Sequence, residues 1–147
     1  MAHLRTQIRQ AVKAALLDLP TTGANVFTSR PGPLPDARLP ALIIETNAED
    51  ASGFDLQDET DDRDLTLLVI GRAKHSDELD DVLDQIALEV EQAMKASGSA
   101  ALEGLVESVS YSGMRIGASA DLEKPAGEIR LAYAVRYLPA SADPQST

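Results

Sequence analysis

The residues with the clearest chemical potential form an acidic stretch at positions 45–64, which carries nine carboxylates and one base, Arg63. Inside it, Asp55, Gln57, a glutamate and Asp61 alternate along the chain, as oxygen ligands do in calcium-binding loops. The turn glycine and the closing glutamate of an EF-hand are missing. Adventitious binding of a divalent cation stays open, but a solvated acidic segment is the simpler interpretation.

Other catalytic and ligating side chains are scarce. The chain has no cysteine, which excludes disulfides, thiol nucleophiles and thiolate metal sites, and its two histidines are His3 and His75. We therefore expect no cofactor, no metal site and no enzymatic activity. The formal net charge of −11 argues against bulk binding to nucleic acid and against an anionic membrane surface. We expect no membrane partner and no direct sequence-specific contact with nucleic acid. No apolar segment has the length that crosses a bilayer, and the N-terminus does not resemble a signal peptide.

The elements that must position these residues follow from hydrophobic periodicity. Helices are predicted at 3–18 and from Ser76 to Met94, and strands at 25–29, 40–46, 64–70, 105–111 and 129–137. The order α-β-β-β-α-β-β predicts an α+β fold, with two helices packed on a mostly antiparallel sheet of four to five strands. We expect one domain over residues 1–138, with a mobile acidic loop at 47–62 and a disordered tail at 139–147.

The predicted strand at 64–70 is apolar on both faces. Leu65, Leu67 and Val69 form one face, while Leu68 and Ile70 make the other partly apolar. A strand with this pattern is covered on both sides, either by helices of the same chain or by a neighbouring subunit. The sequence leaves these two possibilities equally open.

Three arginines near the C-terminal strands complement the acidic stretch. Arg130 and Arg136 share one face of their predicted strand, since an even number separates them, and Arg115 precedes them. They are solvated charges in an isolated chain, but partners for a neighbour's acidic loop in an assembly. Such a head-to-tail contact closes into a ring when it is repeated around an axis. The residues predicted to make intersubunit contacts are Asp55, Asp58, Glu59, Asp61, Asp62, Arg63, Leu68, Ile70, Arg115, Arg130 and Arg136.

A set of short segments resembles a known family. The segments are Leu4–Val12, the Thr-Thr-Gly turn at 21–23, Val26–Arg30, Leu39–Ile44, Arg63–Leu67, Leu83–Glu91 and Leu131–Tyr137. Together they are similar to the tail terminators of long, non-contractile-tailed phages and related tailed particles, the minor tail protein U-like family. The resemblance runs from about Leu4 to Leu138 and consists of side-chain patterns without a catalytic signature.

The resemblance implies a structural virion protein. Members of that family form a hexameric ring on the head-proximal end of the tail tube, stop its polymerisation and offer a surface for head joining. The implied partners are further copies of the chain, the major tail tube protein and a head-completion or neck protein, in a particle assembled in the host cytoplasm. The alternatives are another neck connector or tail-completion protein, or a small divalent-metal-binding enzyme.

Overall fold

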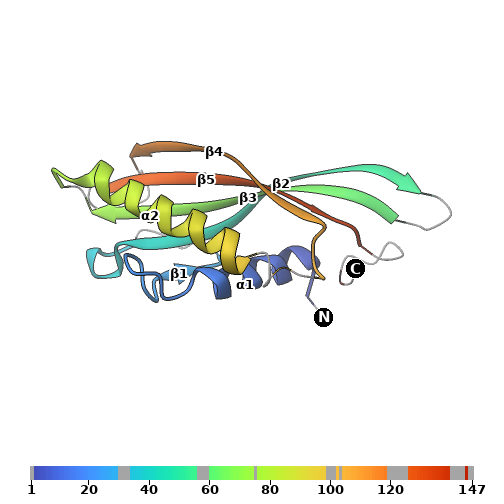
Figure 1. Ribbon diagram of the computed structural model, residues 1–147, viewed down its shortest axis with the longest axis horizontal. Coiled ribbons are helices and arrows are strands. Elements are labelled where there is room, and N and C mark those ends of the chain that lie inside the picture. Colours follow the sequence, from blue (N-terminus) through green and yellow to red (C-terminus); the bar gives the residue numbers. More distant parts are fainter. Residues whose placement is uncertain are drawn as a thin grey trace.

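A single five-stranded sheet, with strand order β1-β2-β3-β5-β4, forms the body of the computed structural model (Figure 1). The structure describes residues 2–29, 34–55, 60–74, 76–98, 102, 104–118, 126–139 and 145. The strands are β1 (Val26–Phe27), β2 (Ala41–Asp55), β3 (Thr60–Lys74), β4 (Ser108–Ala118) and β5 (Ala126–Tyr137). The helices are α1 (Leu4–Leu16) and α2 (Leu79–Ala93), with a short 3-10 helix at Asp36–Arg38 and a π-helical turn at Met94–Gly98. The predicted α+β class and element order are confirmed.

Helix α1 packs on the sheet through a stripe at four-residue spacing. Leu4, Ile8, Val12 and Leu16 are buried, as the periodicity predicts. The helix begins after His3, whose Nδ1 accepts a hydrogen bond from the Arg5 backbone N–H at 3.1 Å. Burial and the nearby arginines lower the pKa of His3, so this acceptor stays neutral and suits a helix N-cap.

Helix α2 covers the same face of the sheet with Leu83, Ile86 and Val90. It begins three residues later than predicted, and its N-cap is Glu78, which makes no side-chain capping hydrogen bond. Ser76, where the predicted helix starts, therefore lies before the helix and is not its cap. The bounds of α1, β1 and β5 lie within three residues of those predicted.

The predicted acidic loop was wrong over most of its length, because β2 and β3 continue into it as one long antiparallel hairpin. Residues 47–55 and 60–62 belong to the strands, with Ser52 opposite Asp62 and Asp55 opposite Thr60. Residues 56–59, which include Asp58 and Glu59, lie outside the described part. Figure 1 shows this hairpin projecting beyond the helices. Backbone pairing between β2 and β3, joined by β5 from Arg63 onward, and nearby arginines offset the repulsion that favoured a loop.

The second face of β3 is covered by the chain itself at one end. Ile70 is fully buried with Leu34, Leu39, Ala41 and Ile43, so the proline-rich segment before β2 provides the cover. This corrects the expectation that Ile70 contacts a neighbouring subunit, since a buried side chain offers no such surface. Leu68 is only half-buried.

The strand predicted at 105–111 begins at Ser108 and runs on to Ala118. A register shift lies between Tyr111 and Gly113, and a second lies between Thr46 and Ala48 in β2. Each shift inserts one extra residue, and such a bulge breaks the apolar–polar alternation. Gly113 has φ of 152° at this point, where glycine is the residue that adopts such a backbone freely.

Candidate functional site

The part of the sheet that no helix covers is the open face, formed by Ala48, Thr66, Leu68, Ala132 and Ala134. Each of these side chains is half-buried or exposed. The registers place these residues on the side opposite the helices, because their cross-strand partners share one face. The open face therefore presents small and apolar groups to its surroundings.

Two of the predicted contact residues, Arg115 and Arg130, meet on the open face as directly opposite residues of β4 and β5. They border an open depression of about 420 Å³, together with Asn47, Leu68 and Ala132. Like charges directly opposite each other across two strands are destabilising. The pair therefore places two positive charges side by side on the open face, one of which, Arg130, is bound to Glu128.

Arg130 is held in place by a buried ion network. Its Nε donates to Glu128 Oε1 at 2.6 Å, and Arg72 Nε donates to Glu128 Oε2 at 3.0 Å. Glu128 and Arg72 are 5% and 3% exposed. Burial opposes ionisation of Glu128, but the hydrogen bonds from Arg130 and Arg72 outweigh it and keep its pKa below the ordinary value. Sequence reasoning missed this network, because the partners are 56 residues apart.

Arg136 has a partner in its own chain. Its Nε donates to Asp64 Oδ1 at 2.9 Å, and the two residues are directly opposite on β5 and β3. The hydrogen bond and charge of Asp64 raise the pKa of Arg136. Because the pair is exposed, it contributes little to stability. Its clear effect is to neutralise one carboxylate at the root of the hairpin.

Arg63 belongs to a cluster that ties the hairpin to α1. Glu49 accepts hydrogen bonds from Arg5 at 2.8 Å and from the Tyr137 hydroxyl, and Arg63 lies 3.8 Å from the same carboxylate. The Arg63 guanidinium also lies over the Tyr137 ring, 6.0 Å from its centroid. Its contacts within the chain give Arg63 a structural role that the sequence did not predict.

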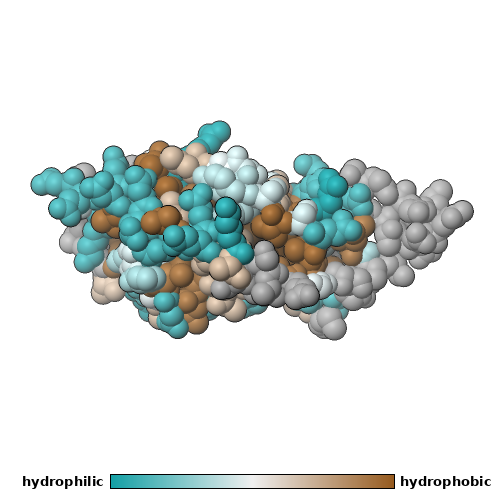
Figure 2. Space-filling view, viewed as in Figure 1, coloured by the Kyte–Doolittle hydropathy of each residue, from teal (hydrophilic) through white to brown (hydrophobic). Residues whose placement is uncertain are grey.

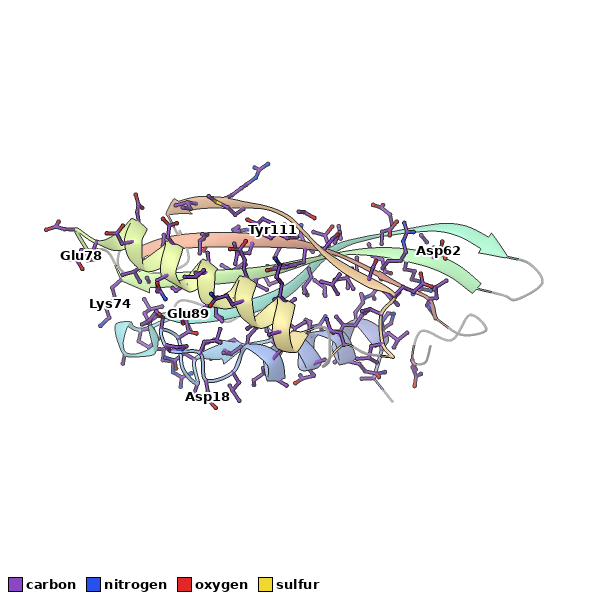
Figure 3. All side chains as sticks on the ribbon, viewed as in Figure 1. Asp18, Asp62, Lys74, Glu78, Glu89 and Tyr111 are labelled. Carbon is purple, nitrogen blue, oxygen red and sulfur yellow. The ribbon has the colours of Figure 1, made fainter. Side chains whose placement is uncertain are left out.

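Of the acidic residues predicted to make contacts, Asp55, Asp61 and Asp62 belong to the hairpin end of β2 and β3, away from the arginine pair. Asp62 is half-buried there, and Figure 3 shows it on the projecting hairpin, far from Lys74 and Glu78 at the other end of the molecule. The backbone of Asp55 and Asp61 is in β2 and β3. Ile70 is the residue of β3 opposite Arg130. Asp62 lies eight residues from Ile70 along the same strand, a distance of about 26 Å.

A set of exposed apolar side chains lies beside β4 and was not predicted. Tyr111, Met114 and Ile116 on β4 and Leu88 on α2 are each 44–50% exposed. Figure 2 shows brown, apolar groups interrupting the teal surface where α2 and β4 lie. The alternating positions of Met114 and Ile116 could have indicated this surface. The bulge after Tyr111 separates these two residues from the strand predicted at 105–111.

The buried carboxylates of the described residues are satisfied by hydrogen bonds. Glu89 accepts from the Thr21 backbone N–H at 2.9 Å, the Thr21 hydroxyl at 2.5 Å and Gln85 at 2.9 Å. Burial raises its pKa, but these bonds outweigh burial and leave it lowered. Glu89 is thus a structural anion that joins the segment after α1 to α2, and it is not poised as a general acid.

Metal and membrane sites are not evident in the part of the chain that the structure describes. No group of three or more His, Cys, Asp or Glu residues there is arranged to hold a metal ion. No described helix combines the length and apolar character needed to span a membrane. Gln57 and Glu59 of the calcium-like spacing, and His75, lie outside the described residues.

These features define an α+β protein whose distinctive groups lie on open sheet surfaces, as charge pairs and apolar side chains. Residues 3–137 match the model of the phage minor tail protein U family. The chain belongs to that family and is a structural component of a phage-type tail. A chain of a solved structure described as the virion of a native gene transfer agent particle is 19% identical, with 92% of each chain covered and a TM-score of 0.42. A search of curated proteins gives no match.

Proposed function

We propose that this protein closes the head-proximal end of the tail tube as a ring of identical subunits and thereby stops tube polymerisation. Six is the expected number of subunits. The ring then offers its outer surface to a head-completion or neck protein. Membership of the minor tail protein U family gives the class of protein. The separation of charge along one sheet is the structural observation that carries the proposal.

The acidic end of the hairpin and the Arg115–Arg130 pair lie on one rigid sheet. Backbone pairing along the length of β3 keeps Asp62 about 26 Å from the level of Arg130, so they cannot meet in one chain. They can meet between two copies in a head-to-tail contact, and that contact closes into a ring under rotational symmetry. Leu68 on the open face is available to the same contact.

The test is electron microscopy of polymerising tail tube protein, with and without this chain. Shorter tubes with an additional disc at one end are expected, and the disc gives the ring symmetry. Tubes of unchanged length with bare ends would refute termination and favour a neck connector instead. Titration calorimetry with calcium, magnesium and manganese tests the metal-binding alternative, which requires saturable binding.

Charge reversal at the hairpin tests the electrostatic part of the proposal. Asp61→Lys and Asp62→Lys together are expected to change capping and its salt dependence, because attraction between exposed charges is screened by salt. The fold should persist, which circular dichroism checks. Capping at wild-type efficiency across salt concentrations would show that the hairpin charges do not serve assembly.

A further inference from the structure

A groove of about 290 Å³ lies between the end of α2 and the start of β4, on the helix-covered face of the sheet. Its lining residues are Glu91, Met94, Lys95, Val109, Tyr111 and Tyr133. Sites that hold whole small molecules have volumes of about 300–1,000 Å³ and bury most of the ligand. This groove is open and lies at the lower limit of that range, so it suits a single side chain of a partner.

The floor of the groove holds a buried polar group. Tyr133 is 4% exposed, and its hydroxyl has no hydrogen-bond partner in the described part of the chain. Buried polar groups in native proteins are almost always hydrogen-bonded. A group that enters the groove can supply the bond, because a tyrosine hydroxyl both accepts and donates.

The walls of the groove favour a cation. Tyr111 is 47% exposed, and its ring stands at 67° to that of Tyr133, with 5.6 Å between the centroids. Glu91 is half-buried beside these rings: burial raises the pKa of both tyrosines, and the charge of Glu91 raises it further. Among the described residues, none forms an ion pair with the Glu91 side chain. A carboxylate beside aromatic rings attracts cations through its charge and through the ring quadrupoles.

The flank of α2 that faces β4 is acidic. Asp80, Asp84 and Glu91 are separated by four and by seven residues, so they lie on one side of the helix. Because Glu91 lines the groove, this side faces β4. Lys95 also borders the groove, one turn after Glu91, and is a cation that can compete for the same carboxylate. The charge along this flank favours a basic partner over an acidic one.

Apolar side chains continue from the groove along β4. The partners of Tyr111, Met114 and Ile116 on β5 are core residues two levels apart, so these three side chains share the helix-covered face. Each is 44–50% exposed. Two levels correspond to about 7 Å, which is also the spacing of alternate side chains in an extended segment. An extended segment along β4 can therefore fill the groove with one side chain and cover Met114 and Ile116 with the next two on that face.

We propose that the groove binds an arginine side chain in an extended, apolar segment of a partner protein. The guanidinium stacks on the Tyr111 ring, donates to the Tyr133 hydroxyl oxygen and pairs with Glu91. Arginine suits these three contacts better than lysine, because its planar fork carries five donors and stacks on aromatic faces. Apolar side chains two and four residues from the arginine cover Met114 and Ile116.

The site does not overlap the surfaces assigned to the ring contact. Leu68 and the Arg115–Arg130 pair lie on the open face, whereas the groove lies on the helix-covered face. A ring formed through the open face and the hairpin leaves the groove to a different protein. That this partner is a head-completion or neck protein rests on the proposed function, but binding of the arginine segment is a property of the chain.

Titration with a synthetic peptide tests the site. In the probe, leucine and serine alternate around a central arginine, so that either chain direction places leucines two and four residues away. Met94 and Met114 give two of the three methionine methyl signals in NMR spectra. Both signals should shift and saturate as the peptide is added. A peptide with citrulline in place of arginine, similar in shape but uncharged, should bind about tenfold or more weakly.

Variants of the groove should have opposite effects. Glu91→Gln should weaken binding about tenfold, because it removes the counter-charge. Lys95→Gln should strengthen binding, because it removes the competing cation. Asp50→Asn is the matched control, since it removes the same charge at an exposed position of β2, and it should bind like the wild type. Circular dichroism checks that each variant is folded.

The proposal is overturned if millimolar peptide causes no saturable shift, if the citrulline peptide binds equally well, or if Glu91→Gln binds like Asp50→Asn. Shifts of the Met94 and Met114 signals that follow protein concentration without peptide would assign the groove to a second copy and also overturn it. Tubes capped by wild-type protein that does not bind the peptide would refute this site alone. Peptide binding by a protein that leaves tubes uncapped would refute the terminator function alone.

Discussion

Replacement of Glu128 by glutamine should destabilise the fold strongly, because it removes the charge that balances buried Arg72. The side chains of Arg72 and Glu128 are 4% and 7% exposed, so little water replaces the lost partner. Removing one member of a buried ion pair costs about 3–5 kcal/mol, a large share of the 5–15 kcal/mol that holds a typical domain folded. We expect a loss of this size in the free energy of unfolding.

Urea denaturation at neutral pH measures the loss, at two protein concentrations that separate folding from self-association. The double variant Arg72→Met/Glu128→Leu is the matched control, since apolar replacement of both partners is often neutral or stabilising. It should unfold near the wild-type midpoint. A cost below about 1 kcal/mol for Glu128→Gln would refute the reasoning, because the buried arginine would then not need its partner.

The same variant makes a pH prediction. The pKa of Glu128 is lowered in the folded protein, so its stabilisation is complete above the unfolded value near 4.5 and is lost as pH falls through the folded value. The difference between wild type and Glu128→Gln should therefore shrink in acid. A difference that is constant from neutral pH down to strong acid would contradict the assigned charge state.

Three further outcomes are expected. Tyr137→Phe should cost about 1.5–3 kcal/mol in urea denaturation, because its partly buried carboxylate partner, Glu49, loses a hydrogen bond; a cost near zero would contradict this. Burial raises the pKa of Tyr133 and of Tyr137 to about 12, so stability should fall as pH rises from about 10 to 12. Absorbance titration of the tyrosines checks this, and ionisation of all of them near pH 10 would exclude it. Gly127→Ala should cost about 1–3 kcal/mol, since its Cβ would lie 2.6 Å from Leu79, whereas Gly117→Ala meets nothing within 4 Å and should be neutral.

The sequence predicts the elements whose periodicity is unbroken. The stripe of α1 and the alternation of β5 were both recovered, since each depends on one repeated spacing. The hairpin was missed because charge density predicts a loop, whereas pairing along β3 decides the outcome. The end of β4 was misplaced because the alternation stops at its bulge, after Tyr111.

The candidate site was only partly predictable, for a related reason. The shared face of Arg130 and Arg136 follows from the even number of residues that separates them along one strand. The structure brings Arg115 beside Arg130. The roles of Arg63 and Ile70 within the chain depend on distant partners, Glu49 and Leu34. No local sequence pattern indicates such partners, so these contacts can be identified only from the three-dimensional structure.

The two bulges carry a consequence for changes in chain length. Thr46 and Tyr111 lie at one level, through Leu67 and Tyr133, so the extra residues Asn47 and Ser112 follow at matching places in the two outer strands. Deletion of either one would remove its bulge and leave the pairing and facing of the remaining residues unchanged, because the extra residue has no cross-strand partner. Glu49 would stay in its cluster, and Met114 would stay on the side opposite Arg115. Each outer strand can thus lose one residue at its bulge without exchanging its two surfaces, whereas a one-residue slip in a regular ladder exchanges them.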